Sequence, residues 1–226
     1  MAFELNKVVP WGRNLEEYKS MFNLSNFELD KRIISFGDGP ASFNAEMTKL
    51  GKSVLSIDPI YQFSKTDLQY RISETKDIVI EQTRKNLDNF KWEKIHDVHH
   101  LEEIRMKAMK NYIEDFVIGK LDGRYLYHEL PYKTEIADSS FDIGLSSHFL
   151  ILYSLLGIDF HLKSITEMLR LCREIRIFPL LNLNVQKSEV LDDILSYFKS
   201  DYELSIVKVD YEFQKNANEM LVIRHK

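Results

Sequence analysis

The sequence has little cysteine, glycine or proline, and each shortage excludes a class of structure. Its 226 residues contain one cysteine, Cys172, which excludes an intrachain disulfide and a cysteine zinc cluster. The eight glycines and five prolines form no rich tract and no internal repeat, so no segment is a candidate linker. We therefore expect one folded domain over residues 1–226, in a reducing compartment such as the cytoplasm.

Long apolar runs and an excess of positive charge are missing as well. The apolar stretch 149–158 is interrupted by Tyr153 and Ser154 and is too short to cross a bilayer. The start, Met1 to Lys7, has no apolar segment of signal-peptide length. The formal net charge of −5 argues against broad nucleic-acid binding. These absences favour a cytoplasmic protein that acts away from membranes and nucleic acids, on a small molecule.

The most informative segment is residues 32–58. An apolar run, Ile33–Phe36, stops at a glycine turn, and an amphipathic helix begins behind Pro40. A second apolar run, Val54–Ile57, is followed by Asp58. The order of strand, glycine turn, helix, strand and acid predicts the nucleotide-binding corner of an open α/β sheet, where ligands lie beyond the strand ends.

Two residues of this corner bear on which nucleotide it takes. Ser42 stands where the dinucleotide fingerprint has its third glycine, and Asp38 between the two glycines would repel phosphates. S-adenosylmethionine has a sulfonium, an ammonium and a ribose but no phosphate, and Asp58 is placed to accept both ribose hydroxyls. A nicotinamide oxidoreductase is the alternative, disfavoured by Asp38, by Ser42 and by two alternating C-terminal segments that predict a hairpin.

The segment Asp138–His148 places a turn and a Ser-Phe-Asp element before a buried strand. It resembles the fourth-strand signature of class I S-adenosylmethionine-dependent methyltransferases. The resemblance runs from about Arg32 to the C-terminus, and the matching positions are Gly37, Gly39, Pro40, Asp58, Phe141 and Asp142. It implies a Rossmann-like three-layer sandwich with a seven-stranded, mostly parallel sheet and an antiparallel last strand. Ser35 departs from the family, which has there the acid that holds the methionine ammonium, and Asp38 is the candidate substitute.

The chain between the second and third strands is much longer than one crossover needs, and its pattern predicts a helical insertion at about 62–120. We expect two or more helices there, which either cap the pocket or thicken the helix layer. The other expected elements are helices at 14–24, from an N-cap at Asp159 to Cys172, and at 191–198, with strands near 124–128, 143–146, 174–178, 203–213 and 219–224.

His148 is the candidate catalytic residue, because it follows the fourth strand at the edge where methyl group and acceptor would meet. Its alternative role is to cap a helix or to bind backbone in the loop. Arg13 could pair with the methionine carboxylate and Trp11 could cover the cation. The alternative is that Trp11 packs on the sheet edge and Arg13 is a surface residue. The resemblance assigns adenine contact to Glu129. The candidate cofactor-binding residues are Trp11, Arg13, Gly37, Asp38, Gly39, Pro40, Asp58, Pro59, Glu129 and Ser146.

These patterns favour methyl transfer from S-adenosylmethionine to a small molecule. The alternative is a non-catalytic binder of S-adenosylmethionine or S-adenosylhomocysteine, motivated by Ser35 and by the absence of a catalytic motif such as Asn-Pro-Pro-Tyr. We expect no metal: His96 and His100 have helix spacing, but no third ligand accompanies them, and a polar helix start explains both.

Overall fold

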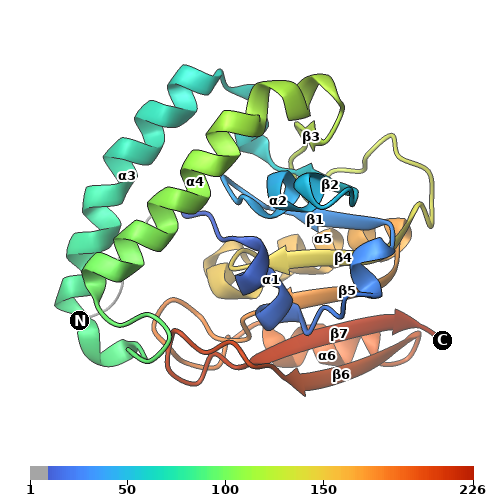
Figure 1. Ribbon diagram of the computed structural model, residues 1–226. Helices are drawn as coiled ribbons and strands as arrows, with labels where there is room; N and C mark the ends of the chain where they lie inside the picture. Colours follow the sequence, from blue (N-terminus) through green and yellow to red (C-terminus); the bar gives the residue numbers. More distant parts are fainter. Residues whose placement is uncertain (1–9) are drawn as a thin grey trace.

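The computed structural model describes residues 10–226. The segment Met1 to Lys7, in which no signal peptide is expected, lies outside the described residues. Seven strands form one sheet in the order β3-β2-β1-β4-β5-β7-β6 (Figure 1). They are β1 (Ile33–Phe36), β2 (Val54–Ile57), β3 (Tyr125–Leu126), β4 (Phe141–Ser147), β5 (Cys172–Phe178), β6 (Tyr202–Lys208) and β7 (Glu219–His225). β7 runs antiparallel to β5 and β6 on either side of it, and the other neighbouring pairs are parallel. The predicted mostly parallel sheet with an antiparallel last strand is confirmed.

Helices cover both faces of this sheet and make three layers. Successive strand residues point to opposite faces, so Ile33 packs in the core under α1 (Leu15–Phe22) and α2 (Phe43–Lys49), whereas Ile34 packs under α5 (Ile158–Leu171) and α6 (Leu191–Phe198). The predicted Rossmann-like sandwich is therefore confirmed.

Two long helices connect β2 to β3, where the sequence predicts an insertion. The helices α3 (Lys65–Lys85) and α4 (Val98–Leu121) form an antiparallel hairpin, and β4 points toward it (Figure 1). The side chain of Asp97 accepts the backbone N–H of His100 at 2.8 Å and begins α4. A polar helix start thus accounts for the histidines, whose rings at 96 and 100 stack 4.8 Å apart.

Two predicted ends of helices and strands are wrong, and the predicted start of the first helix is confirmed. Asp159 is not the N-cap of α5; Gly157 is, and Asp159 lies in the first turn. The strand expected at 203–213 ends at Lys208, because the following residues leave the sheet to contact the α3–α4 loop. The capping box expected at the first helix is present, with Asn14 as its N-cap and Glu17 as its acid.

Gly119 allows α4 to lie directly on β3. A Cβ atom there would lie 2.4 Å from Cε2 of Tyr125 and 2.8 Å from Nη2 of Arg124. We expect Gly119→Ala to lower the free energy of unfolding by about 1–3 kcal/mol, because overpacking outweighs the better helix propensity of alanine. Urea unfolding measures this, with Lys110→Ala on the exposed side of α4 as control. A more stable Gly119→Ala protein would contradict the close packing.

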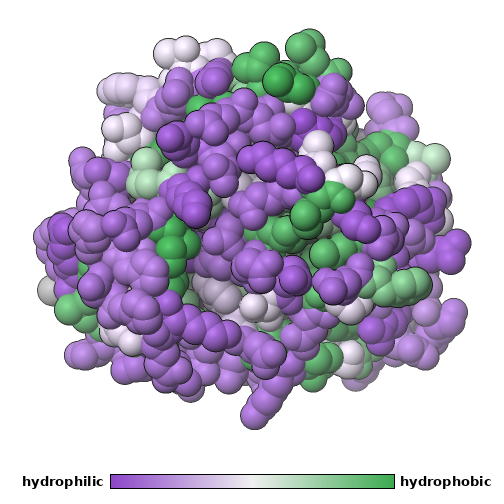
Figure 2. All heavy atoms as spheres, in the orientation of Figure 1, coloured by the Kyte–Doolittle hydropathy of each residue, from purple (hydrophilic) through white to green (hydrophobic). Residues whose placement is uncertain are grey.

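No helix within residues 10–226 is both long enough and apolar enough to cross a membrane. Hydrophilic residues cover most of the face in Figure 2, and apolar residues gather at its top over the carboxyl end of α4. Ile118 and Leu121 are 61% and 84% exposed there.

Candidate functional site

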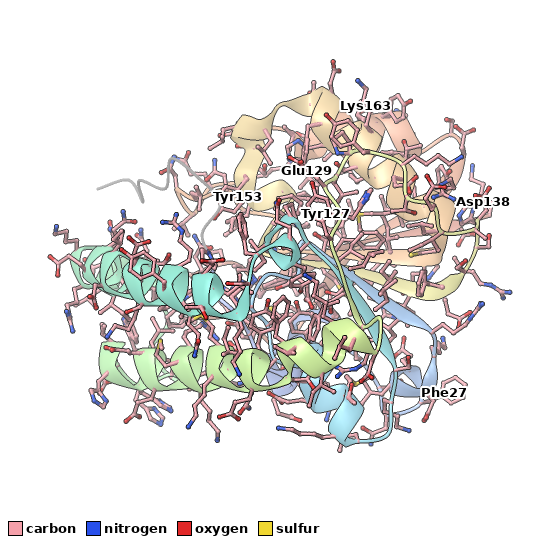
Figure 3. All side chains as sticks on the ribbon, turned by 90° about the horizontal axis from the view of Figure 1, so that it is seen from above. Phe27, Tyr127, Glu129, Asp138, Tyr153 and Lys163 are labelled. Carbon is pink, nitrogen blue, oxygen red and sulfur yellow. The ribbon has the colours of Figure 1, made fainter. Side chains whose placement is uncertain are left out.

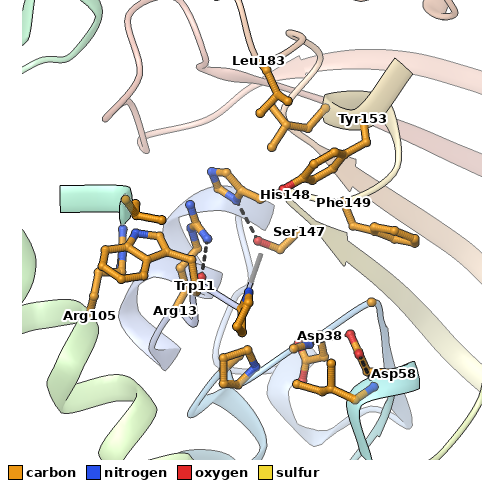
Figure 4. A pocket seen from close by; sticks show the side chains of 18 of the residues that line it. Trp11, Arg13, Asp38, Asp58, Arg105, Ser147, His148, Phe149, Tyr153 and Leu183 are labelled. Carbon is orange, nitrogen blue, oxygen red and sulfur yellow. Dashed lines mark hydrogen bonds between the residues drawn. The ribbon is translucent and has the colours of Figure 1, made fainter. Parts of the chain in front are cut away.

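A cavity of about 460 Å³ lies at the carboxyl ends of β1, β2 and β4. The glycine turn, the segment before α1, the α3–α4 hairpin and the loops after β4, β5 and β6 all contribute to its wall (Figure 4). Its volume is that of a small-molecule site. The insertion therefore contributes to the cavity wall and does more than thicken the helix layer.

The glycine turn forms the floor of the cavity. Gly37 and Gly39 have φ of +62° and +56°, a region that favours glycine. The ring of Phe149 packs on Gly37, where a Cβ atom would lie 2.5 Å from Cδ1. The hydroxyl of Tyr61 donates to the carbonyl of Gly39 at 2.9 Å. Nothing in the local sequence pattern around Phe149 predicts this contact.

Asp58 follows β2 and faces the same cavity. Its Oδ2 accepts the N–H of Gly39 and its Oδ1 accepts the N–H of Ile60, both at 2.8 Å. Burial raises the pKa of this carboxyl to about 6, although the two backbone donors favour the charged form. Each oxygen keeps a lone pair for a further donor, so Asp58 is oriented to accept two neighbouring hydroxyls.

Asp38 lines the cavity but is held by hydroxyl groups of the protein. Its carboxylate accepts hydrogen bonds from the hydroxyls of Ser35 at 2.6 Å, Ser56 at 2.5 Å and Tyr18. Burial raises its pKa against these donors. Ser35 thus helps to hold an acid three residues further along the chain.

The segment before α1 is fixed against the glycine turn. A Cβ atom on Gly12 would lie 2.0 Å from the carbonyl oxygen of Pro40, and the N–H of Ser42 donates to the carbonyl of Arg13 at 3.0 Å. These contacts place Trp11 and Arg13 in the cavity wall. The guanidinium of Arg13 donates to the carbonyl of Trp11 at 2.8 Å, while its buried Nε has no partner.

Arg105 on α4 is a cavity residue that the sequence analysis missed. It is fully buried, its Nη1 lies 2.5 Å from Oε2 of Glu17, and its Nη2 lies 3.3 Å from the hydroxyl of Tyr211. Its Nε is buried without a partner. A sequence signal exists, because Arg105 falls between Leu101 and Ala108 in the apolar stripe of α4, where a lone cation is unusual.

His148 follows β4 and lines the cavity with Ser147. Its φ is +51°, its N–H donates to the carbonyl of Phe178 at 2.7 Å, and its Nδ1 lies 2.9 Å from the hydroxyl of Ser147. Burial, followed by the guanidinium groups of Arg13 and Arg105, holds the pKa of this imidazole well below 6.5. His148 is therefore neutral at pH 7 and offers one unprotonated ring nitrogen, and the same burial and cations make it a weaker base than a free imidazole.

Of the remaining predicted cofactor residues, three line the cavity and Ser146 does not. Pro40, Pro59 and Glu129 line the cavity, and Glu129, which is labelled in Figure 3, is exposed. Ser146 is fully buried and does not line the cavity, whereas Ser147 does, because neighbouring strand residues face opposite sides of the sheet. Within residues 10–226, no three His, Cys, Asp or Glu side chains are grouped as they would be to hold a metal.

Comparison with known proteins gives one close relative and several distant structures. No protein-family model matches the chain. It is 38% identical over 222 residues to the uncharacterized protein MJ0045 of Methanocaldococcus jannaschii, covering 97% of each chain. The mitomycin 7-O-methyltransferase MmcR is similar in structure, with a TM-score of 0.50 and 10% identity over 94% of this chain and 54% of that one. An Aquifex aeolicus SAM dependent methyltransferase has a TM-score of 0.45 and 12% identity, over 92% of both chains. The likeness to MmcR shows the fold of the class I methyltransferases.

Proposed function

We propose that this chain, which belongs to the same family as MJ0045 and has the class I methyltransferase fold, is an S-adenosylmethionine-dependent methyltransferase acting on a small molecule. The observation that carries the proposal is Asp58. It is a buried carboxylate at the end of the second strand, oriented by two backbone N–H groups beside a glycine turn. Such a carboxylate suits the two hydroxyls of a ribose.

The described residues fit the parts of this cofactor. Asp58 would hold the ribose, and we assign the adenine contact to Glu129 and Pro59, which line the same cavity. Arg13, with its unpartnered Nε, would take the methionine carboxylate. Asp38, in the glycine turn, has one acceptor position left after three hydroxyl donors, and its carboxylate would favour the ammonium. The bound cofactor supplies a methyl group already activated by its sulfonium.

Calorimetric titration with S-adenosylhomocysteine, with NADH as the control, tests the cofactor. We expect S-adenosylhomocysteine to bind and NADH to bind at least tenfold more weakly, because Asp38 and the missing third glycine disfavour a pyrophosphate. NADH binding without S-adenosylhomocysteine binding would instead favour a nicotinamide oxidoreductase.

The affinity for S-adenosylhomocysteine should depend on pH through Asp58. The ionised carboxylate accepts both ribose hydroxyls, whereas the protonated form must donate at one oxygen. Because the pKa of this carboxyl is about 6 in the free protein, it is mostly ionised at pH 7 and mostly protonated at pH 5. We expect the association constant to fall about tenfold between those values. A titration series that stays flat from pH 7 to pH 5 would contradict this role.

His148 is placed to receive the proton that a hydroxyl or amine acceptor loses. We expect His148→Asn to lower kcat by about 100-fold, the usual contribution of a general base, while the affinity for S-adenosylhomocysteine changes less than twofold. Asparagine tolerates positive φ, so the backbone should be kept. Initial rates with an acceptor from a screen measure this. Full turnover by the variant would show that His148 is not the general base. If the wild type turns over no acceptor, the non-catalytic binder is favoured.

A further inference from the structure

The wall of the cavity also contains side chains that the proposed cofactor contacts do not use, including the polar Thr83, Asn89 and Gln214. The apolar ones include Val79 of α3, Leu101 of α4 and Leu183 of the loop after β5, together with Phe90 and Phe213. We call these five residues the apolar chamber. Val79 lies fourteen residues along α3 from Lys65, which is about 21 Å at 1.5 Å per residue. The chamber is therefore lined by the distant end of the hairpin.

Two loops that are far apart in the sequence meet over this chamber. The N–H of Lys91 donates to the carbonyl of Phe213 at 2.7 Å, and the N–H of Lys215 donates to the carbonyl of Asn89 at 2.9 Å. The rings of Phe90 and Phe213 stack with their centroids 4.8 Å apart. The α3–α4 loop and the β6–β7 loop thus form a joined wall, which leaves room for a small molecule rather than a macromolecule.

The charged residues named at the cavity so far are each assigned to another partner, which leaves no charge to pair with a charged acceptor. Asp38 and Asp58 lie at the glycine turn, and Arg13 is assigned to the methionine carboxylate. Arg105 lies one turn of α4 from Leu101 of the chamber, but Glu17 at 2.5 Å balances its charge. The buried Nε–H of Arg105 has no partner, and burying such a donor without a hydrogen bond is costly. An uncharged oxygen on the ligand would satisfy it without adding a charge.

We propose that the methyl acceptor is an uncharged aromatic molecule bearing a hydroxyl group, bound in the apolar chamber. Its oxygen would take the methyl group, the cofactor would leave as S-adenosylhomocysteine, and the hydroxyl proton would pass to His148. This inference rests on the proposed function. The apolar side chains favour the rings through burial, and Arg105 favours the oxygen. A carboxylate on the same ring skeleton is disfavoured, because it would leave water for apolar surroundings with no unbalanced cation to meet it.

Calorimetric titration of the protein saturated with S-adenosylhomocysteine tests this, with 2-naphthol as probe and 2-naphthoate as its charged counterpart at pH 7.5. We expect 2-naphthol to bind at least tenfold more tightly than 2-naphthoate. Leu183→Asp should weaken 2-naphthol binding at least tenfold and leave S-adenosylhomocysteine binding unchanged. The matched control is Leu155→Asp, which alters a leucine that is 68% exposed and lies outside the cavity wall; it should change neither affinity.

Tighter binding of 2-naphthoate, or 2-naphthol binding that Leu183→Asp leaves intact, would overturn the inference while the proposed function stands. If Leu183→Asp does not melt cooperatively, Val79→Phe, which fills the chamber, is used in its place. It too should weaken 2-naphthol binding at least tenfold and leave S-adenosylhomocysteine binding unchanged. If the wild type does not bind S-adenosylhomocysteine, the proposed function fails. The naphthol titrations, repeated on the protein alone, then still decide what the chamber binds.

Discussion

Asp58→Asn should weaken S-adenosylhomocysteine binding about 100-fold, which corresponds to about 2.7 kcal/mol. The carboxylate already accepts the N–H groups of Gly39 and Ile60 at 2.8 Å, one on each oxygen. An asparagine has one oxygen, so its amide NH2 must face either a backbone N–H or a ribose hydroxyl that needs an acceptor. A hydrogen bond to a charged group contributes about 1.5–3 kcal/mol, and the substitution removes at least one. Calorimetry at pH 7 measures the loss.

The matched control for this variant is Asp97→Asn. Asp97 is another carboxylate that accepts a backbone N–H, that of His100 at 2.8 Å, but it lies outside the cavity wall. Its substitution should leave S-adenosylhomocysteine binding unchanged. If Asp58→Asn binds as tightly as the wild type, the ribose lies elsewhere and the glycine corner serves only the architecture.

Arg105→Met should lower the free energy of unfolding by about 3–5 kcal/mol, the usual cost of removing one partner of a buried ion pair. Arg105 is fully buried, and its partner Glu17 has a side chain that is 11% exposed. Without Arg105, Glu17 keeps the hydroxyl of Tyr211 at 3.0 Å and the N–H of Asn14 at 3.2 Å, but it loses its nearest cation. Urea unfolding, followed by circular dichroism, measures the change.

Two further variants separate the lost charge pair from other effects. Adding Glu17→Gln to Arg105→Met should restore part of the lost stability, because the uncompensated buried carboxylate is then absent. Arg71→Met is the surface control: its ion pair with Glu74 joins half-exposed side chains and should contribute less than about 1 kcal/mol. A loss below about 1 kcal/mol for Arg105→Met would mean that Glu17 does not depend on its partner.

The sequence predicted the elements whose signals are local. The run Ile33–Phe36, the glycine turn and Val54–Ile57 became β1, its turn and β2, and Asn14 with Glu17 formed the expected capping box. Alternation, glycine turns and caps are decided by residues within a few positions of one another. The mostly parallel sheet and its antiparallel last strand were anticipated from the resemblance to the class I methyltransferases.

Element ends and side-chain partners were less predictable. The strand expected to reach Phe213 stops at Lys208, because the next residues pair with the α3–α4 loop more than a hundred positions earlier. Asp38, read as a ligand for the cofactor, is held by three hydroxyls, and one of them comes from Ser56 on the neighbouring strand. No local pattern contains these contacts.

By itself, the sequence determined the fold class, the glycine corner and the presence of Asp58 behind the second strand. Only the tertiary structure decided that Ser147 rather than Ser146 lines the cavity, that Arg105 joins Glu17, and that the distant end of the hairpin forms a wall of the cavity. The physical reason is that periodicity and capping fix the conformation of each element. The cavity instead depends on how long-range packing sets those elements against one another.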